Sequence, residues 1–409
     1  MKIFFSVGEP SGDLHASRLM TALRRERPTI EVYGLGGPLM EAAGLRSVYR
    51  LTDLAVMGFL QVLPLLWKFW SVYRIACAEL RRNRPDLVVL VDFPGFNWWI
   101  AAAAKRLGIR VVYYMPPQLW AWAPWRIRKV RKYVDLVLCS LPFEYEWYRQ
   151  RGVAAQLVGH PFFDEVAEHP LDSGFLQQIE QAQSLGHPVV AILPGSRRNE
   201  VRDNFPIQIQ VMRELVARVP QVQFLVANYK AQQREMCQAM LAEQPPLPVS
   251  LHVGKVSEIL KRADACVQVS GSVSLEILAR AIPTVVIYKA NRWLAQLAQR
   301  VFMTCRYISL PNLIENRVLL PEFWPMNDEA EAVVQICDQI QPWLIDASAR
   351  GEKIRELQSL RSRIMEPGAT QRAADRIIAF SDRVSRDLSD AVLPSRPTDL
   401  DPESLAPAA

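Results

Sequence analysis

Short apolar runs rich in β-branched residues alternate with helix-like segments along the chain, and this alternation starts again in the second half. Strands that are apolar throughout are typical of a parallel sheet with helices on both faces. The first series of predicted strands is Ile3–Val7, Glu31–Leu35, Asp86–Val91, Val111–Met115 and Leu136–Cys139. The second series is Val189–Leu193, Gln223–Ala227, Ser250–Val253, Ala265–Val269 and Thr284–Tyr288. We therefore expect an α/β protein with two doubly wound, Rossmann-like domains.

The length of 409 residues also favours two domains, because single hydrophobic cores stop growing at shorter lengths. We expect the first domain to span residues 1–165 and the second to span residues 166–345. Residues 346–382 should form helices that pack back on the first domain. Residues 383–409 are rich in Ser, Asp and Pro, which predicts a disordered tail.

The net charge of +6 favours anionic partners, such as phosphorylated substrates, nucleic acid or an acidic membrane surface. The six cysteines are far apart and form no CxxC pair, which indicates reduced thiols and no zinc site. The apolar run Met1–Val7 is too short for a signal peptide, so a cytoplasmic location is expected.

The first strand runs into a turn, residues 8–15, that opens a helix. Glycines allow the backbone to approach a ligand there, and the helix N-terminus attracts anions. Neither the GxGxxG spacing nor a GK[ST] ending is present, so a tight turn capped by Ser11 or Asp13 is an equal alternative. The candidate substrate-binding residues of this turn are Glu9, Ser11, Gly12 and Asp13.

Two similar turns follow strands of the second series. In the first of them, Gly195 and Ser196 expose backbone amides and Arg197 can contact a leaving diphosphate, the alternative being a capped turn with solvated arginines. In the other, the candidate phosphate-binding residues are Ser270, Gly271 and Ser272. Glu276, on the helix that follows, could accept both hydroxyls of a ribose, although a capping box fits equally well. Two such turns in one domain favour a nucleoside diphosphate.

Asp92 follows a first-series strand, where ligands of open α/β sheets bind, so it is a candidate general base; capping the next helix is the alternative. His15 and His160 lie near strand ends and could contact substrate, or could form structural hydrogen bonds. Since the only Asp-x-Asp is Asp399–Asp401, in the predicted tail, we expect neither a metal nor a cofactor.

Two features suggest a lipid surface. The apolar segment 54–73 contains Gln61, Pro64 and Lys68, so it fails the test for a spanning helix and could instead lie on a membrane or in the core. Its candidate contacts with membrane or acyl chains are Met57, Phe59, Leu63, Leu66, Trp67 and Trp70. Trp120, Trp122 and Trp125 precede a basic run, residues 126–132, that could meet anionic headgroups. No nucleic-acid motif accompanies this run, so no nucleic-acid partner is expected.

An ordered set of motifs resembles the lipid-A-disaccharide synthase family from Lys2 to Phe380. The matching blocks are Gly8–Leu14, Gly34–Pro38, Leu54–Gly58, Asp92–Asn97, Trp120–Trp122, Gly159–Pro161, Leu193–Arg197, Ser270–Glu276 and Leu310–Leu313. The resemblance implies a type-B glycosyltransferase fold, whose two domains face a central cleft, with acceptor on the first domain and UDP-sugar on the second.

The implied reaction joins UDP-2,3-diacylglucosamine to 2,3-diacylglucosamine 1-phosphate, giving a β(1→6)-linked disaccharide 1-phosphate and UDP. It would take place without a metal at the cytoplasmic face of the inner membrane, where the enzyme is peripherally associated. A homodimer is compatible with the resemblance.

The same resemblance implies roles for individual residues. Asp92 would deprotonate the acceptor's 6-hydroxyl, while Arg197 and the amides near Gly195 and Gly271 would stabilise the departing diphosphate. Glu276 would hold the ribose, and Asn312 would lie near the sugar or diphosphate. The segment after Leu54 would admit the acyl chains.

The chain departs from the family pattern at Gly95, where a second acidic residue is usual, and at Pro116–Gln118, Ser272, Ser274 and Pro325. The serines keep the hydroxyl groups of the usual threonines, so nucleotide binding should be little affected. Acyl-chain preference stays open. Two other functions also stay open: a UDP-N-acetylglucosamine 2-epimerase, and a non-catalytic protein that binds UDP-sugar or lipid at the membrane surface.

Overall fold

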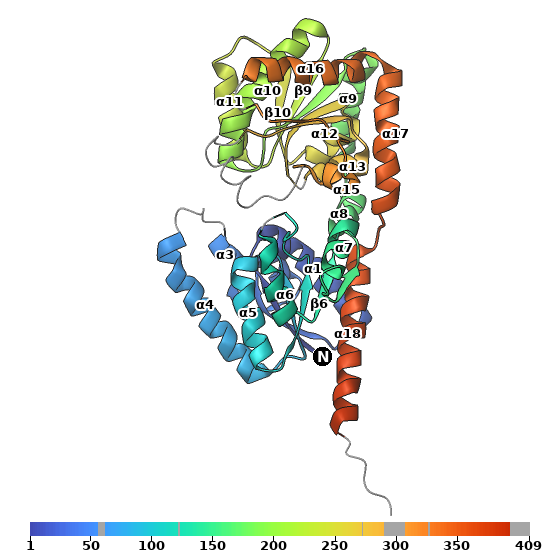
Figure 1. Ribbon diagram of the computed structural model, residues 1–409. Coiled ribbons are helices and arrows are strands. Elements are labelled where there is room, and N and C mark those ends of the chain that lie inside the picture. Colours follow the sequence, from blue (N-terminus) through green and yellow to red (C-terminus); the bar gives the residue numbers. More distant parts are fainter. Residues whose placement is uncertain (56–61, 122, 272, 290–306, 326–327, 393–409) are drawn as a thin grey trace, which may run out of the picture.

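The computed structural model describes the chain except residues 56–61, 122, 272, 290–306, 326–327 and 393–409. The described residues form two lobes, each built around a parallel sheet (Figure 1). The first sheet has the order β3-β2-β1-β4-β5-β6-β7. Its strands are β1 (Lys2–Val7), β2 (Glu31–Gly36), β3 (Arg46–Arg50), β4 (Leu87–Val91), β5 (Arg110–Tyr114), β6 (Leu136–Cys139) and β7 (Ala155–Leu157).

The second sheet has the order β10-β9-β8-β11-β12-β13, also with parallel pairing throughout. Its strands are β8 (Val189–Leu193), β9 (Gln223–Asn228), β10 (Val249–Val253), β11 (Ala265–Val269), β12 (Thr284–Ile287) and β13 (Glu322–Phe323). All ten predicted strands are confirmed within one residue at each end. The sequence missed β3, β7 and β13, which are edge strands of two to five residues whose side chains are not fully buried.

Strand order reverses between β1 and β4 in the first sheet and between β8 and β11 in the second. Ligands of such sheets bind beyond the carboxyl ends of the strands at this reversal. The pairing of Val7 with Val91 places the turn after β1 beside the turn after β4. The pairing of Leu193 with Gln268 does the same for the turns after β8 and β11. The topology thus brings together two pairs of the segments selected from the sequence, one pair in each sheet.

Helices cover both faces of each sheet. The first lobe contains α1 (Pro10–Glu26), α2 (Pro38–Ala42), α3 (Thr52–Ala55), α4 (Val62–Asn83), α5 (Pro94–Arg106), α6 (Ile127–Tyr133) and α7 (Pro142–Arg149). The following helices are α8 (Pro161–Glu168), α9 (Ser173–Ser184), α10 (Arg198–Arg218), α11 (Ala231–Ala242), α12 (Val256–Arg262), α13 (Val273–Arg280), α15 (Leu310–Glu315), α16 (Glu329–Ile345), α17 (Ala347–Ile364) and α18 (Ala369–Val392).

Successive strand residues point to opposite faces, so each strand contributes to two core clusters. On β5, for example, Tyr113 packs in one cluster of the first lobe, whereas Tyr114 packs in the other. Both side chains are fully buried. This two-sided burial explains why the central strands are apolar at most positions, as in β4 and β8.

The C-terminal helices divide between the lobes, as Figure 1 shows. Helix α17 packs on α13 and α16 of the second lobe. Its Leu357 and Leu360 are buried there in one apolar cluster with Leu278 of α13. Only α18 packs back on the first lobe, where Ala373 and Ile377 join the core beside α1. The domain limits, including the return of residues 346–382 to the first domain, stay predictions.

Helix α18 continues to Val392, where the described part of the chain ends, and the expected start of the disordered tail at residue 383 stays a prediction. None of the helices in the described part of the chain is long and apolar enough to span a membrane.

Candidate active site

Asp92 lies at the strand reversal of the first sheet, directly after β4. A Cβ added at Gly8 would lie 2.2 Å from the ring of Phe93, so the two turns pack this closely only because position 8 is glycine. A Cβ added at Gly12 would lie 3.8 Å from Asp92 Cβ, which is an ordinary contact distance and places Gly12 beside Asp92. The structure thus brings the predicted base into contact with the predicted ligand-binding turn.

The carboxyl group of Asp92 is a weaker acid than an ordinary aspartate. Burial and the negative charge of Glu9 raise its pKa to about 7. Burial also raises the pKa of Glu9, whereas the positive charge of Arg197 lowers it. Arg197 lies in the second lobe and Glu9 in the first, so a charge from the second lobe acts on the candidate site of the first lobe. A carboxyl group with a pKa near neutrality can accept a proton from a hydroxyl group and release it again.

The turn after β8 presents Arg197 in an exposed position, with 81% of its side chain accessible. The carboxylate of Glu200 accepts hydrogen bonds from the backbone nitrogens of Ser196, at 2.9 Å, and Arg197, at 3.1 Å. It also accepts one from Arg197 Nη1 at 2.8 Å. Gly195 has φ = 111°, and a side chain there would meet Glu200 at 2.5 Å. The turn therefore binds an anionic group, the carboxylate of Glu200 from the helix that follows the turn.

The turn after β11 is only partly described. Ser270 Oγ donates to the carbonyl oxygen of Ile308 at 3.4 Å, and Gly271 is exposed with open space around it. Ser272 lies outside the described residues. Glu276 is buried and accepts hydrogen bonds from Ser257 Oγ at 2.6 Å and Arg280 Nε at 3.0 Å. Contact between Glu276 and a ribose therefore stays a prediction.

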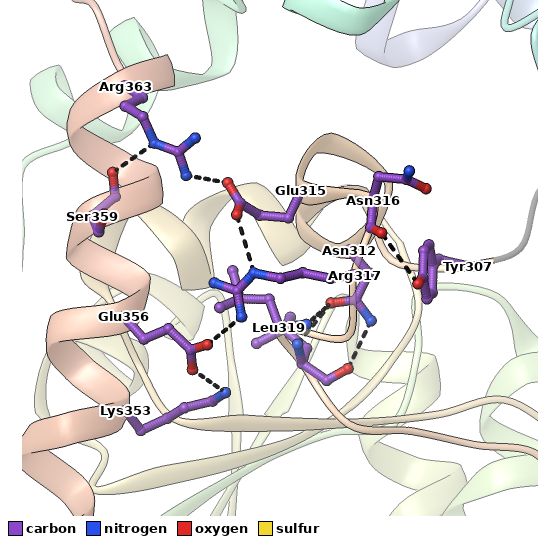
Figure 2. A network of polar contacts seen from close by, with 11 residues as sticks. Tyr307, Asn312, Glu315, Asn316, Arg317, Leu319, Lys353, Glu356, Ser359 and Arg363 are labelled. Carbon is purple, nitrogen blue, oxygen red and sulfur yellow. Dashed lines mark hydrogen bonds and ion pairs between the residues drawn. The ribbon is translucent and has the colours of Figure 1, made fainter.

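Asn312 is fully buried and uses its whole amide inside the chain. Its Oδ1 accepts from the backbone nitrogens of Leu319 and Leu320, and its Nδ2 donates to Leu320 O and Glu322 Oε1, all at 2.7–2.8 Å. Figure 2 shows this amide beside Leu319, with Glu315 nearby between two arginines. These bonds give Asn312 a structural role, and its contact with a sugar or diphosphate stays a prediction.

Other predicted substrate contacts have structural partners. The carboxylate of Asp13 accepts three 3.0 Å hydrogen bonds, from the backbone nitrogens of Gly37, Leu39 and Met40 at the start of α2. His160 Nδ1 accepts from Phe162 N at 3.2 Å and so caps α8. Burial lowers the pKa of His160 to about 3, which keeps its ring neutral. Ser11 is exposed on the first turn of α1.

Sequence reasoning missed Glu144, a buried acid near the site. Burial raises its pKa to about 7, and the Asp92 charge adds to this rise. Its carboxylate accepts from Ser140 N at 3.0 Å and from Trp120 Nε1 at 3.4 Å. Trp120 is buried with its indole nitrogen toward Glu144, so it does not form part of the lipid-facing surface suggested for it together with Trp122 and Trp125. The signal available was the acidic third residue of a helix that begins with proline.

The α4–α5 surface carries exposed aromatic side chains. Trp67 is 79% exposed and Trp70 is 48% exposed, and Trp70 packs against Tyr73 and Trp99 of the same surface. Trp125, from the second aromatic group, is also exposed. Three of the predicted positions, Met57, Phe59 and Trp122, are outside the described residues, as are the side chains of Leu63 and Leu66.

No group of three or more His, Cys, Asp or Glu side chains in the described ranges is arranged to hold a metal ion. The first sheet contributes acids and the second contributes an exposed arginine. This arrangement can remove a proton from one ligand and stabilise negative charge on another.

Comparison with known proteins identifies the family. The family described as LpxB, lipid-A-disaccharide synthetase, matches residues 3–364. The chain belongs to this family. A lipid-A-disaccharide synthase of Anaeromyxobacter sp. (strain K) is 34% identical over 92% of this chain and 97% of the relative. The one of Myxococcus xanthus is 31% identical over the same shares of the two proteins.

Solved structures of related shape show the fold of this family member. It is similar to a putative UDP-N-acetylglucosamine 2-epimerase from Listeria monocytogenes, with a TM-score of 0.63, 12% identity and 98% coverage of both chains. It is also similar to CalG4, the calicheamicin glycosyltransferase, with a TM-score of 0.59, 18% identity and coverage of 94% and 99%. The expected type-B glycosyltransferase fold is confirmed.

Proposed function

We propose that this protein transfers 2,3-diacylglucosamine from its UDP derivative to 2,3-diacylglucosamine 1-phosphate, forming the β(1→6)-linked disaccharide 1-phosphate and UDP. Family membership supports the reaction. The observation that carries the chemistry is the carboxyl group of Asp92, whose pKa is raised to about 7 and which lies next to the turn after β1. The positive charge of Arg197 reaches Glu9 in that same turn.

In this proposal Asp92 accepts the proton of the acceptor's 6-hydroxyl as the oxygen attacks the anomeric carbon of the donor. Attack from the face opposite to the diphosphate inverts the anomeric centre. Arg197, together with the amides of Gly195, Ser196 and Gly271, stabilises the negative charge that develops on the leaving diphosphate. Ser270 and Ser272 line the same side, and Glu276 holds the ribose. This use of arginine and amides requires no metal ion.

The acceptor is expected on the first lobe, near Glu9, Ser11 and Gly12, with its acyl chains toward the α4–α5 surface. We infer that this surface rests on the cytoplasmic face of the inner membrane, since exposed aromatic residues favour the interface. A homodimer is part of the proposal because of the family resemblance alone.

The test is incubation with the two acylated glucosamine substrates, followed by mass analysis of the product and measurement of released UDP. Asp92→Asn should lose turnover while it still binds UDP. Arg197→Ala should lose both turnover and UDP affinity, whereas Arg202→Ala, an exposed arginine one turn further along α10, should keep both. Activity should persist in EDTA.

The rival function is a UDP-N-acetylglucosamine 2-epimerase, which the similarity in shape to the Listeria monocytogenes protein favours. Such an enzyme would form an epimer from the UDP-sugar alone, without acylated acceptor. A non-catalytic binding protein would be unaffected by Asp92→Asn. Either result would contradict the proposed transfer.

A further inference from the structure

The backbone at the end of β4 adopts an uncommon conformation. Asp92 has φ = 50° and Phe93 has φ = 47°, so two consecutive residues other than glycine are left-handed. Side chains disfavour this region, and it persists only where the surrounding structure holds it. The groups that bond to Asp92 therefore show how the conformation is maintained.

Asn97, on the first part of α5, is one of these groups. Its side chain is fully buried, and its Nδ2 donates to the carbonyl oxygens of Asp92 at 2.7 Å, Val91 at 3.2 Å and Ser6 at 3.2 Å. Its Oδ1 accepts from Ser6 Oγ at 2.6 Å. Because Ser6 belongs to β1 and Val91 to β4, one amide side chain joins both strands at the reversal to the turn that contains Asp92.

Tyr113 approaches the same carbonyl oxygen from another element. Its ring is buried in the core beneath β5, and its hydroxyl donates to Asp92 O at 2.7 Å. The carbonyl of Asp92 thus accepts hydrogen bonds from a helix residue and from a neighbouring strand. Rotation of this peptide group would change the backbone conformation of Asp92 and would break both bonds, including the acceptor that the buried Tyr113 hydroxyl uses.

We propose that Asn97 and Tyr113 are positioning residues that hold Asp92 in its left-handed conformation and so direct its carboxyl group toward the acceptor. The proposal rests on the function proposed above, in which Asp92 is the base. Neither side chain needs to touch the substrate. Their effect is on the geometry of proton removal, where small displacements of a reacting group are costly.

Tyr113→Phe tests this proposal because it removes the hydroxyl and leaves the ring. The matched control is Tyr114→Phe, which removes a buried hydroxyl from the next residue of β5, on the opposite face of the sheet. We expect Tyr113→Phe to lower kcat roughly 10- to 100-fold, with the KM of the donor and the affinity for UDP unchanged. Tyr114→Phe should keep the wild-type kcat. Melting temperatures of both variants report the structural cost separately.

Asn97→Ala should reproduce the fall in kcat with UDP affinity retained. If this variant does not fold, the tyrosine pair still decides. Wild-type kcat in Tyr113→Phe, or equal losses in Tyr113→Phe and Tyr114→Phe, would overturn the proposal. Asp92→Asn, assayed in parallel, separates the positioning role from the role of Asp92 as base. If Asp92→Asn loses turnover and Tyr113→Phe does not, the positioning role is refuted and the base remains. Full turnover of Asp92→Asn would instead remove the base and the positioning role together.

Discussion

Arg372 donates a 2.8 Å hydrogen bond from Nε to the carbonyl oxygen of Val158. Its Nη atoms donate to the carbonyl oxygens of Pro367, at 2.7 Å, and Glu366, at 3.0 Å. Val158 lies where the chain leaves the first lobe, and residues 366–367 lie where it returns to that lobe from α17. One side chain on α18 therefore ties the two crossings together, beside Gly159, where a side chain would lie 2.7 Å from the guanidinium.

Arg372→Ala should consequently destabilise the protein. Loss of charged donors from three carbonyl oxygens should lower the free energy of unfolding by about 1–3 kcal/mol. Urea unfolding measures this change. Arg376→Ala, an exposed arginine one turn further along α18, is the control and should have little effect. Equal stability of the two variants would show that the crossings do not depend on Arg372.

The rate should depend on the ionisation of Asp92. A base must be deprotonated to act, and the pKa of this carboxyl group is about 7. The value of kcat/KM for the acceptor should therefore rise with pH through about 7 and then level off. A pH profile measured with saturating donor checks this prediction. An acid limb near pH 4, the ordinary range of an aspartate, would contradict the raised pKa.

The same group makes a second prediction, for stability. The folded pKa of Asp92 lies above the value of 3.8 expected for the unfolded chain. The folded protein thus binds the proton of Asp92 more tightly than the unfolded chain does. The stability that this proton binding contributes is present at low pH and is lost as pH rises through about 7. Asp92→Asn cannot ionise, so it should melt higher than wild type near pH 8, with a smaller difference near pH 5. The opposite trend in calorimetry would refute the sign of this shift.

The buried amide of Asn312 provides a test of structure against ligand binding. Asn312→Ala leaves the backbone nitrogens of Leu319 and Leu320 without their acceptor, which should destabilise the protein by about 2–4 kcal/mol. Asn316→Gly is the control, since Asn316 is exposed and left-handed, and glycine accepts that conformation. A loss of UDP affinity in Asn312→Ala without a loss of stability would favour the ligand contact predicted from the sequence.

The strands were predictable because a strand that is buried on both faces requires a continuous run of apolar residues, as in Val189–Leu193. The position of Asp92 followed from the end of such a run. The hydrogen bond from Tyr113 to Asp92 could not be predicted, because Tyr113 lies in a core strand and its sequence position does not distinguish it from other buried aromatic residues. Glu144 was missed for a related reason: only the tertiary fold brings a helix-capping acid close to Asp92. Contacts between distant segments need the topology as well as the pattern.

The exposed aromatic residues of α4 predict how the protein meets a membrane. Trp67 is 79% exposed, although burial of an aromatic ring is normally favourable, so its exposure suggests a partner outside the described chain. Trp67→Ser should weaken binding to vesicles that contain anionic phospholipid by roughly tenfold, the equivalent of about 1.4 kcal/mol. Leu185→Ser is the matched control, because Leu185 is also exposed, at 70%, but lies in the second lobe. Co-sedimentation with vesicles measures both variants. Equal binding by the two would show that the α4–α5 surface is not the one that contacts lipid.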